Sequence, residues 1–192
     1  MIKAIIFDLD GVLVDTKKIH FEALNKALKK FNYKEIKFED HVKIFDGLPT
    51  NEKLKILNKK NKLPKKNFSK INKFKQKITS DILKKRIKKN LELINIFKKL
   101  YKNYKIAVAT NAVNSTLKIC LEKLGISKYV HYKLSNEDIN VAKPNPEIYL
   151  RIFIKFGIYP SEALILEDSH YGREAAISSG AKLLPIKKIE EL

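Results

Sequence analysis

The sequence predicts an α/β protein with a doubly wound parallel β-sheet and a small inserted α-helical module. Three observations support this fold class. Short apolar runs alternate with segments of helical periodicity, as expected for a parallel sheet covered by helices on both faces. The stretch between residues 31 and 89 is rich in lysine and has helical segments but little strand character. Three of the apolar runs end in polar residues, and ligands bind at the carboxyl ends of parallel strands.

The N-terminal part of the chain is predicted to contain one strand followed by several helices. The apolar run at residues 3–7 indicates a buried strand, and the tight turn Asp8-Leu9-Asp10-Gly11 follows it. Apolar residues then recur three or four positions apart over residues 17–31, which predicts a helix capped by Asp15 or Thr16. Two further helices are expected at residues 51–61 and 74–87. Gly47-Leu48-Pro49 and Pro64 break the helical pattern before each of them.

The C-terminal part alternates between helices and strands. The expected helices cover residues 91–101, 115–124, 146–156 and 172–179. The expected strands cover residues 106–110, 129–134 and 163–166, with a last apolar stretch at 181–186. Gly125 follows the second of these helices at the position of a C-terminal cap. The alternation places Thr110 and Asp168 at strand ends, where we expect them to approach Asp8.

The basic composition admits two interpretations. The chain of 192 residues has 40 lysines and arginines against 21 acidic residues, and its net charge of +19 would suit a polyanionic partner. Only Arg86, Arg151 and Arg173 are arginines, although arginine is the residue suited to bidentate phosphate and base contacts. We therefore favour a solvated basic surface, with no specific nucleic acid as partner, over a non-catalytic nucleic-acid-binding module.

The composition also bears on the cellular compartment. Cys120 is the single cysteine and cannot form an intrachain disulfide, and its apolar neighbours on a predicted helix favour burial over reactivity. No apolar stretch reaches the roughly 20 residues of a membrane span, so no membrane association is expected. The expectation is a cytoplasmic protein that is a monomer or a weak dimer.

The acidic turn after the first strand has the residues that phosphoryl transfer requires. An ionised carboxylate beside a divalent cation can attack phosphorus, and a second carboxyl group can protonate the leaving oxygen and then deprotonate water. Asp8 and Asp10 supply two such groups. Cationic and hydrogen-bonding groups must also stabilise the phosphoryl oxygens, and Lys143 and Thr110 are the candidates for this role.

Four motifs spaced along the chain carry a family resemblance. The first is the run Ile5-Ile6-Phe7-Asp8-Leu9-Asp10-Gly11-Val12-Leu13-Val14-Asp15-Thr16. The others are Thr110-Asn111, Lys143-Pro144-Asn145-Pro146 and Glu167-Asp168-Ser169. In this order they resemble the motifs of the haloacid dehalogenase (HAD) superfamily. The resemblance implies a Rossmann-like HAD catalytic core, which we assign to residues 1–15 and 88–192, and a helical cap at residues 16–87.

The resemblance implies a catalytic role for each matching residue. Asp8 would be the nucleophile that becomes an aspartyl phosphate, and Asp10 would be the general acid and base. Thr110 would bind the transferring phosphoryl oxygens, helped by the N-terminus of the following helix. Lys143 would orient Asp8 and offset the negative charge that develops during transfer.

The resemblance also implies Mg²⁺ as the cofactor. The ion would be held by the Asp8 and Asp168 carboxylates and by the Asp10 backbone carbonyl, with Glu167 in direct contact or one layer behind. Ligand sets made only of oxygen, completed by water, favour magnesium over zinc. Glu167 and Asp168 follow the strand at residues 163–166, where such a pair can also merely end a strand and cap a helix. Of the two, Asp168 is the stronger candidate for a metal ligand.

The segment at residues 16–87 lies where one HAD subclass inserts its cap over the active site. Such a cap excludes water and selects the substrate, with hinges here near residues 15–16 and 84–89. By resemblance, the predicted substrate-binding residues are Thr110 and Asn111 of the core and His20, Gly47, Thr50 and Lys75 of the cap.

The predicted activity is the hydrolysis of a small phosphate monoester by a magnesium-dependent phosphatase. HAD members that cleave carbon–halogen or carbon–phosphorus bonds lack an acid at the position of Asp10, which points to a phosphorylated metabolite such as a sugar phosphate. The alternative is a sugar-phosphate mutase similar to β-phosphoglucomutase, whose cap histidine matches His20. Thr50 stands where that mutase has an arginine for the second phosphate, which favours the phosphatase.

Overall fold

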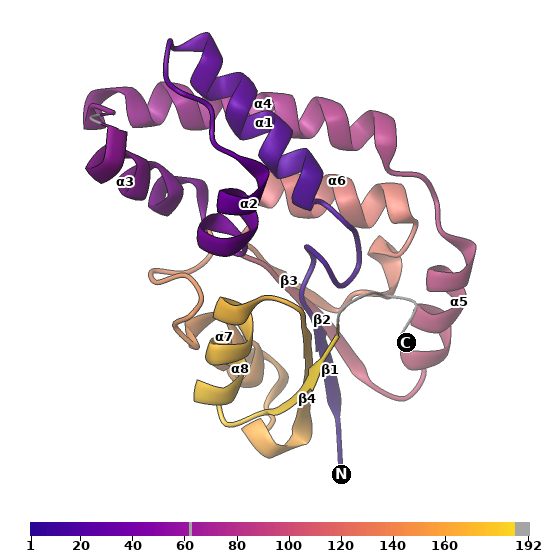
Figure 1. Cartoon of the computed structure of the whole chain (residues 1–192). Coiled ribbons are helices and arrows are strands. Elements are labelled where there is room, and N and C mark those ends of the chain that lie inside the picture. The colour runs from indigo at the N-terminus through magenta and orange to yellow at the C-terminus, as the bar shows by residue number, and fades with distance from the viewer. Residues whose placement is uncertain (62, 187–192) are drawn as a thin grey trace.

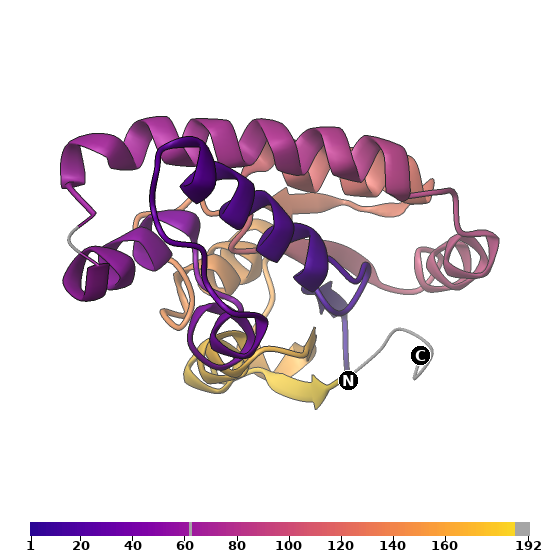
Figure 2. The ribbon, with the colours of Figure 1, turned by 45° about the horizontal axis from the view of Figure 1, so that its top comes forward.

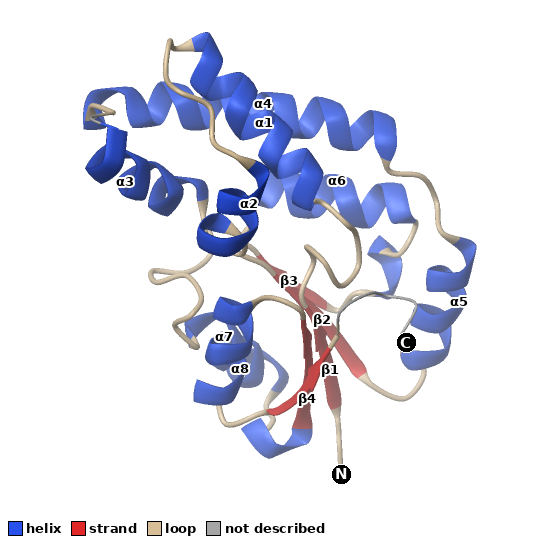
Figure 3. Cartoon of the chain, viewed as in Figure 1, coloured by secondary structure: helices blue, strands red, loops and turns tan. Residues whose placement is uncertain are grey.

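The protein is described by a computed structural model over residues 1–61 and 63–186. Five parallel strands form one sheet in the order β3-β2-β1-β4-β5. The strands are β1 (Ala4–Phe7), β2 (Lys105–Ala109), β3 (Tyr132–Leu134), β4 (Ala163–Glu167) and β5 (Lys182–Pro185). Figure 3 shows the strands at the centre of the lower half of the molecule, between helices.

Helices account for most of the remaining described residues. The α-helices are α1 (Lys17–Lys30), α2 (Phe38–Asp40), α3 (Thr50–Asn61), α4 (Phe68–Arg86), α5 (Leu91–Leu100), α6 (Asn114–Leu124), α7 (Glu147–Phe156) and α8 (His170–Ser178). A π-helical turn, η1 (His41–Phe45), and three 3₁₀ turns, η2 (Lys65–Asn67), η3 (Ser127–Tyr129) and η4 (Pro160–Glu162), complete them. Within the described ranges, no helix has the length and apolar character needed to cross a bilayer.

The sheet separates two apolar cores, because successive side chains of a strand point to opposite faces. In β1, Ile5 and Phe7 pack with α5 and α6, whereas Ala4 and Ile6 pack with α7 and α8. Cys120 of α6 is buried in the first of these cores, as predicted. Figure 1 shows the two helix pairs on opposite sides of the sheet, so the predicted doubly wound arrangement is confirmed.

A third apolar core joins helices that precede α5. Its buried members come from α1, α3, α4 and the segments between them: Leu24, Ala27, Leu28, Phe45, Leu54, Leu57, Leu63 and Ile71. Figures 1 and 2 show α1 and α4 side by side above the carboxyl ends of the strands. Ile19 and Leu83 extend from these helices into the core beneath α6. Ile82 and Ile87 of the same segment also belong to this cluster. We propose that residues 16–87 act as the cap, with a core of their own and an apolar contact with the core beneath α6.

Several predicted boundaries need correction. The strand expected over residues 129–134 begins at Tyr132, and the last backbone hydrogen bond before it runs from the His131 N–H to the Ile106 carbonyl of β2 at 2.9 Å. His131 accounts for this, because its Nδ1 accepts the hydrogen bond of the Ile106 N–H at 3.0 Å, where a longer strand would offer a backbone carbonyl. The helix expected from residue 74 begins at Phe68, since Ile71 already belongs to its buried face. The short α2 and η1 were not predicted.

Candidate active site

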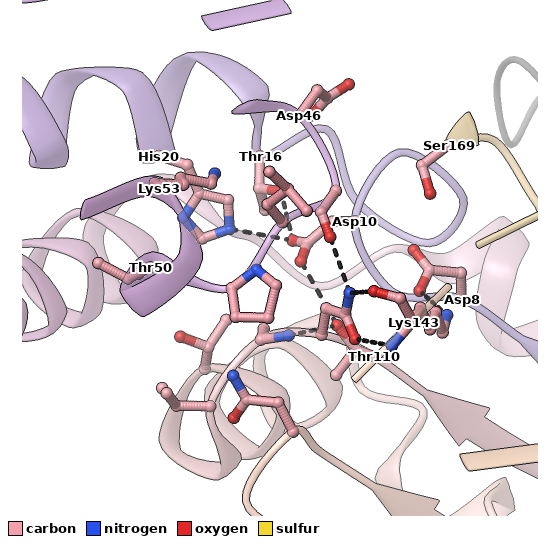
Figure 4. A pocket seen from close by; sticks show the side chains of 18 of the residues that line it. Asp8, Asp10, Thr16, His20, Asp46, Thr50, Lys53, Thr110, Lys143 and Ser169 are labelled. Atoms are coloured by element: carbon pink, nitrogen blue, oxygen red, sulfur yellow. Dashed lines mark hydrogen bonds and ion pairs between the residues drawn. The ribbon is translucent and has the colours of Figure 1, made fainter. Parts of the chain in front are cut away.

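The carboxyl ends of the central strands form one edge of a narrow pocket. Asp8 follows β1 and donates its backbone N–H to Leu166 of β4 at 2.9 Å, and Thr110 follows β2 and donates to Leu134 of β3 at 3.0 Å. The free volume is about 50 Å³, room for a few water molecules. Every predicted site residue except Glu167 lines it: Asp8, Asp10, His20, Gly47, Thr50, Lys75, Thr110, Asn111, Lys143 and Asp168. Figure 4 shows several of these side chains converging on Asp10.

Lys143 lies at the bottom of the pocket and is only 3% exposed. Its Nζ donates to Asp8 Oδ1 at 2.7 Å, to Glu167 Oε2 at 2.7 Å and to the Ala109 carbonyl at 2.9 Å. The loop after β3 therefore carries this ammonium group to a position between two strand ends. All three protons of the ammonium group are used, so Lys143 holds Asp8 in a fixed orientation.

The charges around Asp8 oppose one another. Burial, and next the carboxylate of Glu167, raise the pKa of Asp8 well above its ordinary value, whereas the Lys143 ammonium lowers it. The pKa of Lys143 is itself raised by its two carboxylate partners in spite of burial, so the lysine stays charged. A divalent cation beside these acids would act in the same direction as Lys143 and favour the ionised form of Asp8.

Asp10 is held by hydrogen-bond donors from both the core and the cap segment. The Thr16 hydroxyl donates to its Oδ1, His20 Nε2 lies 3.3 Å from the same oxygen, and the Thr110 hydroxyl lies 3.5 Å from Oδ2. Burial raises the pKa of Asp10, but the hydrogen bond of His20 and its charge when protonated outweigh burial, and with Thr16 and Lys75 they lower the pKa to about 2. Burial and the charge of Lys75 in turn lower the pKa of His20. The carboxylate in this arrangement is ionised and can accept a proton.

Thr16 has a different role from the one expected at the start of α1. It occupies the N-cap position, but its side chain makes no capping hydrogen bond. The hydroxyl donates to Asp10 instead, because the turn between Asp10 and Val14 brings the two residues together. Asp15 offers only an exposed contact, accepting from the Lys17 N–H at 3.3 Å. Of the two predicted caps, Thr16 is therefore wrong, whereas the contact of Asp15 with the first N–H of α1 agrees with the alternative.

Three acids gather where a metal ion could bind. Asp8, Glu167 and Asp168 each offer an oxygen atom, and these atoms lie within 4.8 Å of one another. Asp168 Oδ1 is buried and has no hydrogen-bond partner among the described residues, while Oδ2 pairs with Lys17 at 3.3 Å. Burial and the charge of Glu167 raise the pKa of Asp168 to about 6, a shift that a cation would reverse. The cluster therefore fits a hard divalent cation.

Glu167 is the most enclosed of these acids and lies behind the pocket. Lys143 and the Tyr149 hydroxyl donate to its Oε2, at 2.7 and 3.1 Å, and the Ser169 hydroxyl donates to Oε1 at 2.9 Å. A Cβ on Gly172 would approach the carboxylate to 2.0 Å, so only glycine leaves it room. With its oxygens already bonded, Glu167 is better suited to orient Lys143 than to bind an ion directly.

Gly11 makes room for the Asp168 carboxylate. Its φ is +90°, and a Cβ at this position would lie 2.0 Å from Asp168 Oδ2. Gly11→Ala is therefore expected to displace Asp168 and weaken the binding of a divalent cation at the acidic cluster by roughly 10- to 100-fold, as changes next to metal ligands do. Calorimetric titration with Mg²⁺ would measure the change.

Gly157→Ala is the matched control for this prediction. Gly157 has a similar positive φ of +63°, but nothing lies within 4 Å of the Cβ it would gain. Both variants share the backbone strain of a non-glycine residue in the left-handed region, about 1 kcal/mol. If Gly11→Ala folded and bound Mg²⁺ as tightly as Gly157→Ala, the close approach of Gly11 to Asp168 would have no functional consequence.

Asn111 links the core to the cap segment. Its Nδ2 donates to the Gly47 carbonyl at 2.8 Å and to the Lys143 carbonyl at 3.1 Å, and its Oδ1 accepts from the Lys143 N–H at 3.1 Å. The amide group thus holds the loop that carries Lys143 and ties it to the Gly47 loop. A contact between Asn111 and substrate stays a prediction, because backbone groups occupy its polar atoms here.

The cap segment contributes the opposite wall of the pocket. Lys75 Nζ lies 3.2 Å from His20 Nδ1, and Gln76 Nε2 donates to the Thr50 hydroxyl at 3.2 Å. Lys53 also lines this wall, although the sequence analysis did not single it out. It follows Thr50 by three residues, a spacing that puts both on one face of a helix. Because lysine is abundant in this segment, the spacing did not distinguish Lys53 from the lysines around it.

The parallel α/β fold and the aspartates at the carboxyl ends of its central strands define the class of protein. It is an α/β enzyme whose site uses carboxylate side chains as its reactive groups. Residues 5–186 match the family model described as haloacid dehalogenase-like hydrolase. The chain belongs to this family, as its four motifs predicted.

Relatives of the chain include both phosphatases and a mutase. The phosphorylated carbohydrates phosphatase of Thermotoga maritima is 31% identical over 183 residues, covering 93% of this chain and 82% of that protein. Pyrophosphatase PpaX of Oceanobacillus iheyensis is 24% identical, covering 97% and 86%. The structure of β-phosphoglucomutase from Clostridium difficile matches with a TM-score of 0.80 at 25% identity, covering 96% and 84%. The predicted class of enzyme, a phosphatase of this family, is confirmed.

Proposed function

We propose that this chain is a Mg²⁺-dependent phosphatase that hydrolyses a small phosphate monoester through an aspartyl phosphate on Asp8. The observation that carries the proposal is the 2.7 Å contact between Lys143 Nζ and Asp8 Oδ1, beside the acidic cluster that includes Asp168. A carboxylate fixed between a buried ammonium group and a cation site is oriented to attack phosphorus. Such positioning and charge stabilisation supply most of the catalysis in phosphoryl transfer.

The reaction has two halves. Asp8 attacks phosphorus, and a new carboxylate oxygen–phosphorus bond replaces the ester bond while Asp10 protonates the leaving alkoxide. Asp10 then takes a proton from water, which attacks the aspartyl phosphate, releases phosphate and restores the Asp8 carboxylate. Thr110 hydrogen-bonds the phosphoryl oxygens as their charge grows, and the positive charge of Lys143 offsets that charge while its N–H groups keep Asp8 in place. The ionised, hydrogen-bonded state of Asp10 in the structure suits its role as base in the second half.

The acidic cluster supports magnesium as the resident ion. Asp8 and Asp168 would hold it through their carboxylates and Asp10 through its backbone carbonyl, with Glu167 behind them. The unpartnered Oδ1 of Asp168 is the atom best placed to gain a ligand contact. When bound, the ion supplies positive charge that lowers the repulsion between Asp8 and the phosphoryl oxygens.

The pocket supports a cap that opens and closes. Its free volume of about 50 Å³ is too small for a sugar phosphate, so substrate entry requires the two walls to separate. The connections to the catalytic core run through residues 15–16 and 87–90, on either side of α1 and α4. The proposed cap carries His20, so separation would also release the contact between His20 and Asp10.

A sugar-phosphate mutase is the second candidate. The 3.3 Å contact of His20 with Asp10 favours it, since a histidine from the cap could control when Asp10 is engaged. The uncharged Thr50, whose hydroxyl accepts from Gln76, argues against it, because a mutase must retain and turn over a bisphosphate. The phosphatase at 31% identity supports the same ranking.

Removal of metal should abolish the activity. With a panel of phosphorylated sugars, polyols and nucleotides, we expect phosphate release in Mg²⁺ and none after EDTA, with recovery when Mg²⁺ is restored. Interconversion of glucose 1-phosphate and glucose 6-phosphate that is faster than phosphate release would establish the mutase instead. Salt-sensitive nucleic-acid binding without hydrolysis of any ester would support the basic binding module.

A further inference from the structure

Two buried lysines of the cap segment have no acidic partner within the part of the chain that the structure describes. Lys53 on α3 is 6% exposed and Lys75 on α4 is 4% exposed, and both line the pocket. Neither ammonium group lies within 4 Å of a carboxylate in residues 1–61 and 63–186. The one polar contact of Lys75 there is His20 at 3.2 Å, which adds no negative charge. A buried ammonium group without a counter-ion is costly, so its presence calls for an explanation.

The acids around the pocket are already occupied by other groups. Lys143 pairs with Asp8, and Lys17 pairs with Asp46 at 3.1 Å and with Asp168 at 3.3 Å. Asp10 accepts hydrogen bonds from Thr16 and His20. Apart from Asp46, which is paired with Lys17, the acids that line the pocket belong to the core, so Lys53 and Lys75 give the cap wall an excess of positive charge.

The excess of positive charge and the burial of this wall lower the pKa values of its basic side chains. Burial lowers the pKa of Lys75 to about 7, with the charge of Lys53 next, and burial lowers the pKa of Lys53 to about 8. Burial and then Lys53 also lower the pKa of the neighbouring His41 to about 3. An anion placed between the two lysines would reverse these shifts.

We propose that Lys53 and Lys75 form a subsite for a second anionic group, carried by the alcohol part of the substrate. The subsite rests on the proposed phosphatase function, because the first anionic group is the phosphoryl group at Asp8. Figure 4 shows Lys53 with His20 and Thr50 on one side of Asp10, and Asp8 with Lys143 on the other. A carboxylate or a second phosphate on the leaving group would extend from Asp10 toward this wall.

This subsite places positive charge one helical turn beyond Thr50. Lys53 follows Thr50 on the same face of α3, and both side chains are buried at the pocket. Two separate ammonium groups recognise charge but lack the bidentate geometry of an arginine. The preferred substrates are therefore phosphate esters with a second charge, which the proposed enzyme hydrolyses without the clamp that a mutase needs.

Matched pairs of esters test the subsite. One pair, 2-phosphoglycolate and 2-hydroxyethyl phosphate, tests a carboxylate as the second anionic group. The other pair, fructose 1,6-bisphosphate and fructose 6-phosphate, tests a second phosphate. In at least one of the two pairs, we expect kcat/KM of the native chain to be about 10- to 100-fold higher for the ester with the second charge, as charged hydrogen bonds suggest. Lys53→Met and Lys75→Met should each lower that ratio about tenfold. Lys55→Met, an exposed lysine of the same helix, should leave it unchanged.

Two readouts do not depend on turnover. In Asp8→Asn protein, calorimetry should show the same preference in Kd, and adding Lys53→Met should remove it. Lys53→Met and Lys75→Met should also raise Tm by a few degrees, since each removes a buried unpaired charge. Equal Kd values within both pairs, or ratios unaffected by both lysine variants, would overturn the subsite. Failure to hydrolyse any ester, with the Kd preference intact, would overturn only the phosphatase.

Discussion

Asp8→Asn is expected to lower kcat/KM for any phosphate monoester by about 10⁴-fold or more, as loss of a covalent nucleophile does in other enzymes. The amide oxygen is a far weaker nucleophile than a carboxylate, and the change also removes one charge from the proposed cation site. Asparagine keeps the shape of the side chain, and Lys143 keeps its contact with Glu167, so the fold should persist. Phosphate release in Mg²⁺ and the thermal unfolding midpoint are the measurements.

The control for this change is Asp81→Asn, because Asp81 is an exposed aspartate on α4. Acid quenching of the native chain during turnover should trap phosphate on the protein, and hydroxylamine should remove it because an acyl phosphate is labile to this nucleophile. Asp8→Asn should trap none. Activity of Asp8→Asn within about tenfold of the native chain would exclude Asp8 as the nucleophile, since its loss should cost far more.

Asp10→Asn should divide the reaction into its two halves. With an alkyl phosphate, kcat is expected to fall by about 10²- to 10⁴-fold, because the leaving alkoxide receives no proton. With p-nitrophenyl phosphate, whose leaving group is a weak base, the first half should proceed. The second half should then stall, because no base activates water. We expect a burst of nitrophenolate equal to the enzyme concentration, followed by slow turnover, in a stopped-flow measurement.

His20→Asn provides a milder comparison. It removes one of the groups that contact Asp10 but leaves the Thr16 and Thr110 hydroxyls in place. We expect a partial loss of kcat and no burst, because Asp10 itself remains. Equal steady-state losses for alkyl and aryl esters in Asp10→Asn, with no burst, would contradict its role as acid and base.

The sequence predicted the catalytic core well because local patterns report it directly. The apolar runs that became β1, β2 and β4 are buried on both faces, so they read as short continuous apolar segments. Parallel strands align their carboxyl ends, so polar residues that follow such runs converge on one edge. Asp8, Thr110 and Asp168 were found in this way, and each lies at the pocket.

Other features needed the tertiary structure. The motif pointed to Lys143 and its contact with Asp8, but only the structure shows that its side chain is buried and shared with Glu167 and the Ala109 carbonyl. Thr16 reads as a helix cap, but the turn before it directs the hydroxyl to Asp10. The contacts of Lys143 with Glu167 and of Thr16 with Asp10 join residues that are distant in sequence or lie across a turn, so helical and strand periodicity did not predict them.

By itself, the sequence determined the class of this protein: the doubly wound sheet, its family and the aspartates at the strand ends. Periodicity and motif spacing are properties of the sequence, so they can be recognised without a structure. Only the tertiary structure decided which charges are paired. Lys53 and Lys75 resemble the exposed lysines around them, but the packing of α3 and α4 buries both side chains at the pocket and leaves neither within 4 Å of a described carboxylate. The energy of a charge depends on burial and partners, and these arise when distant segments pack together.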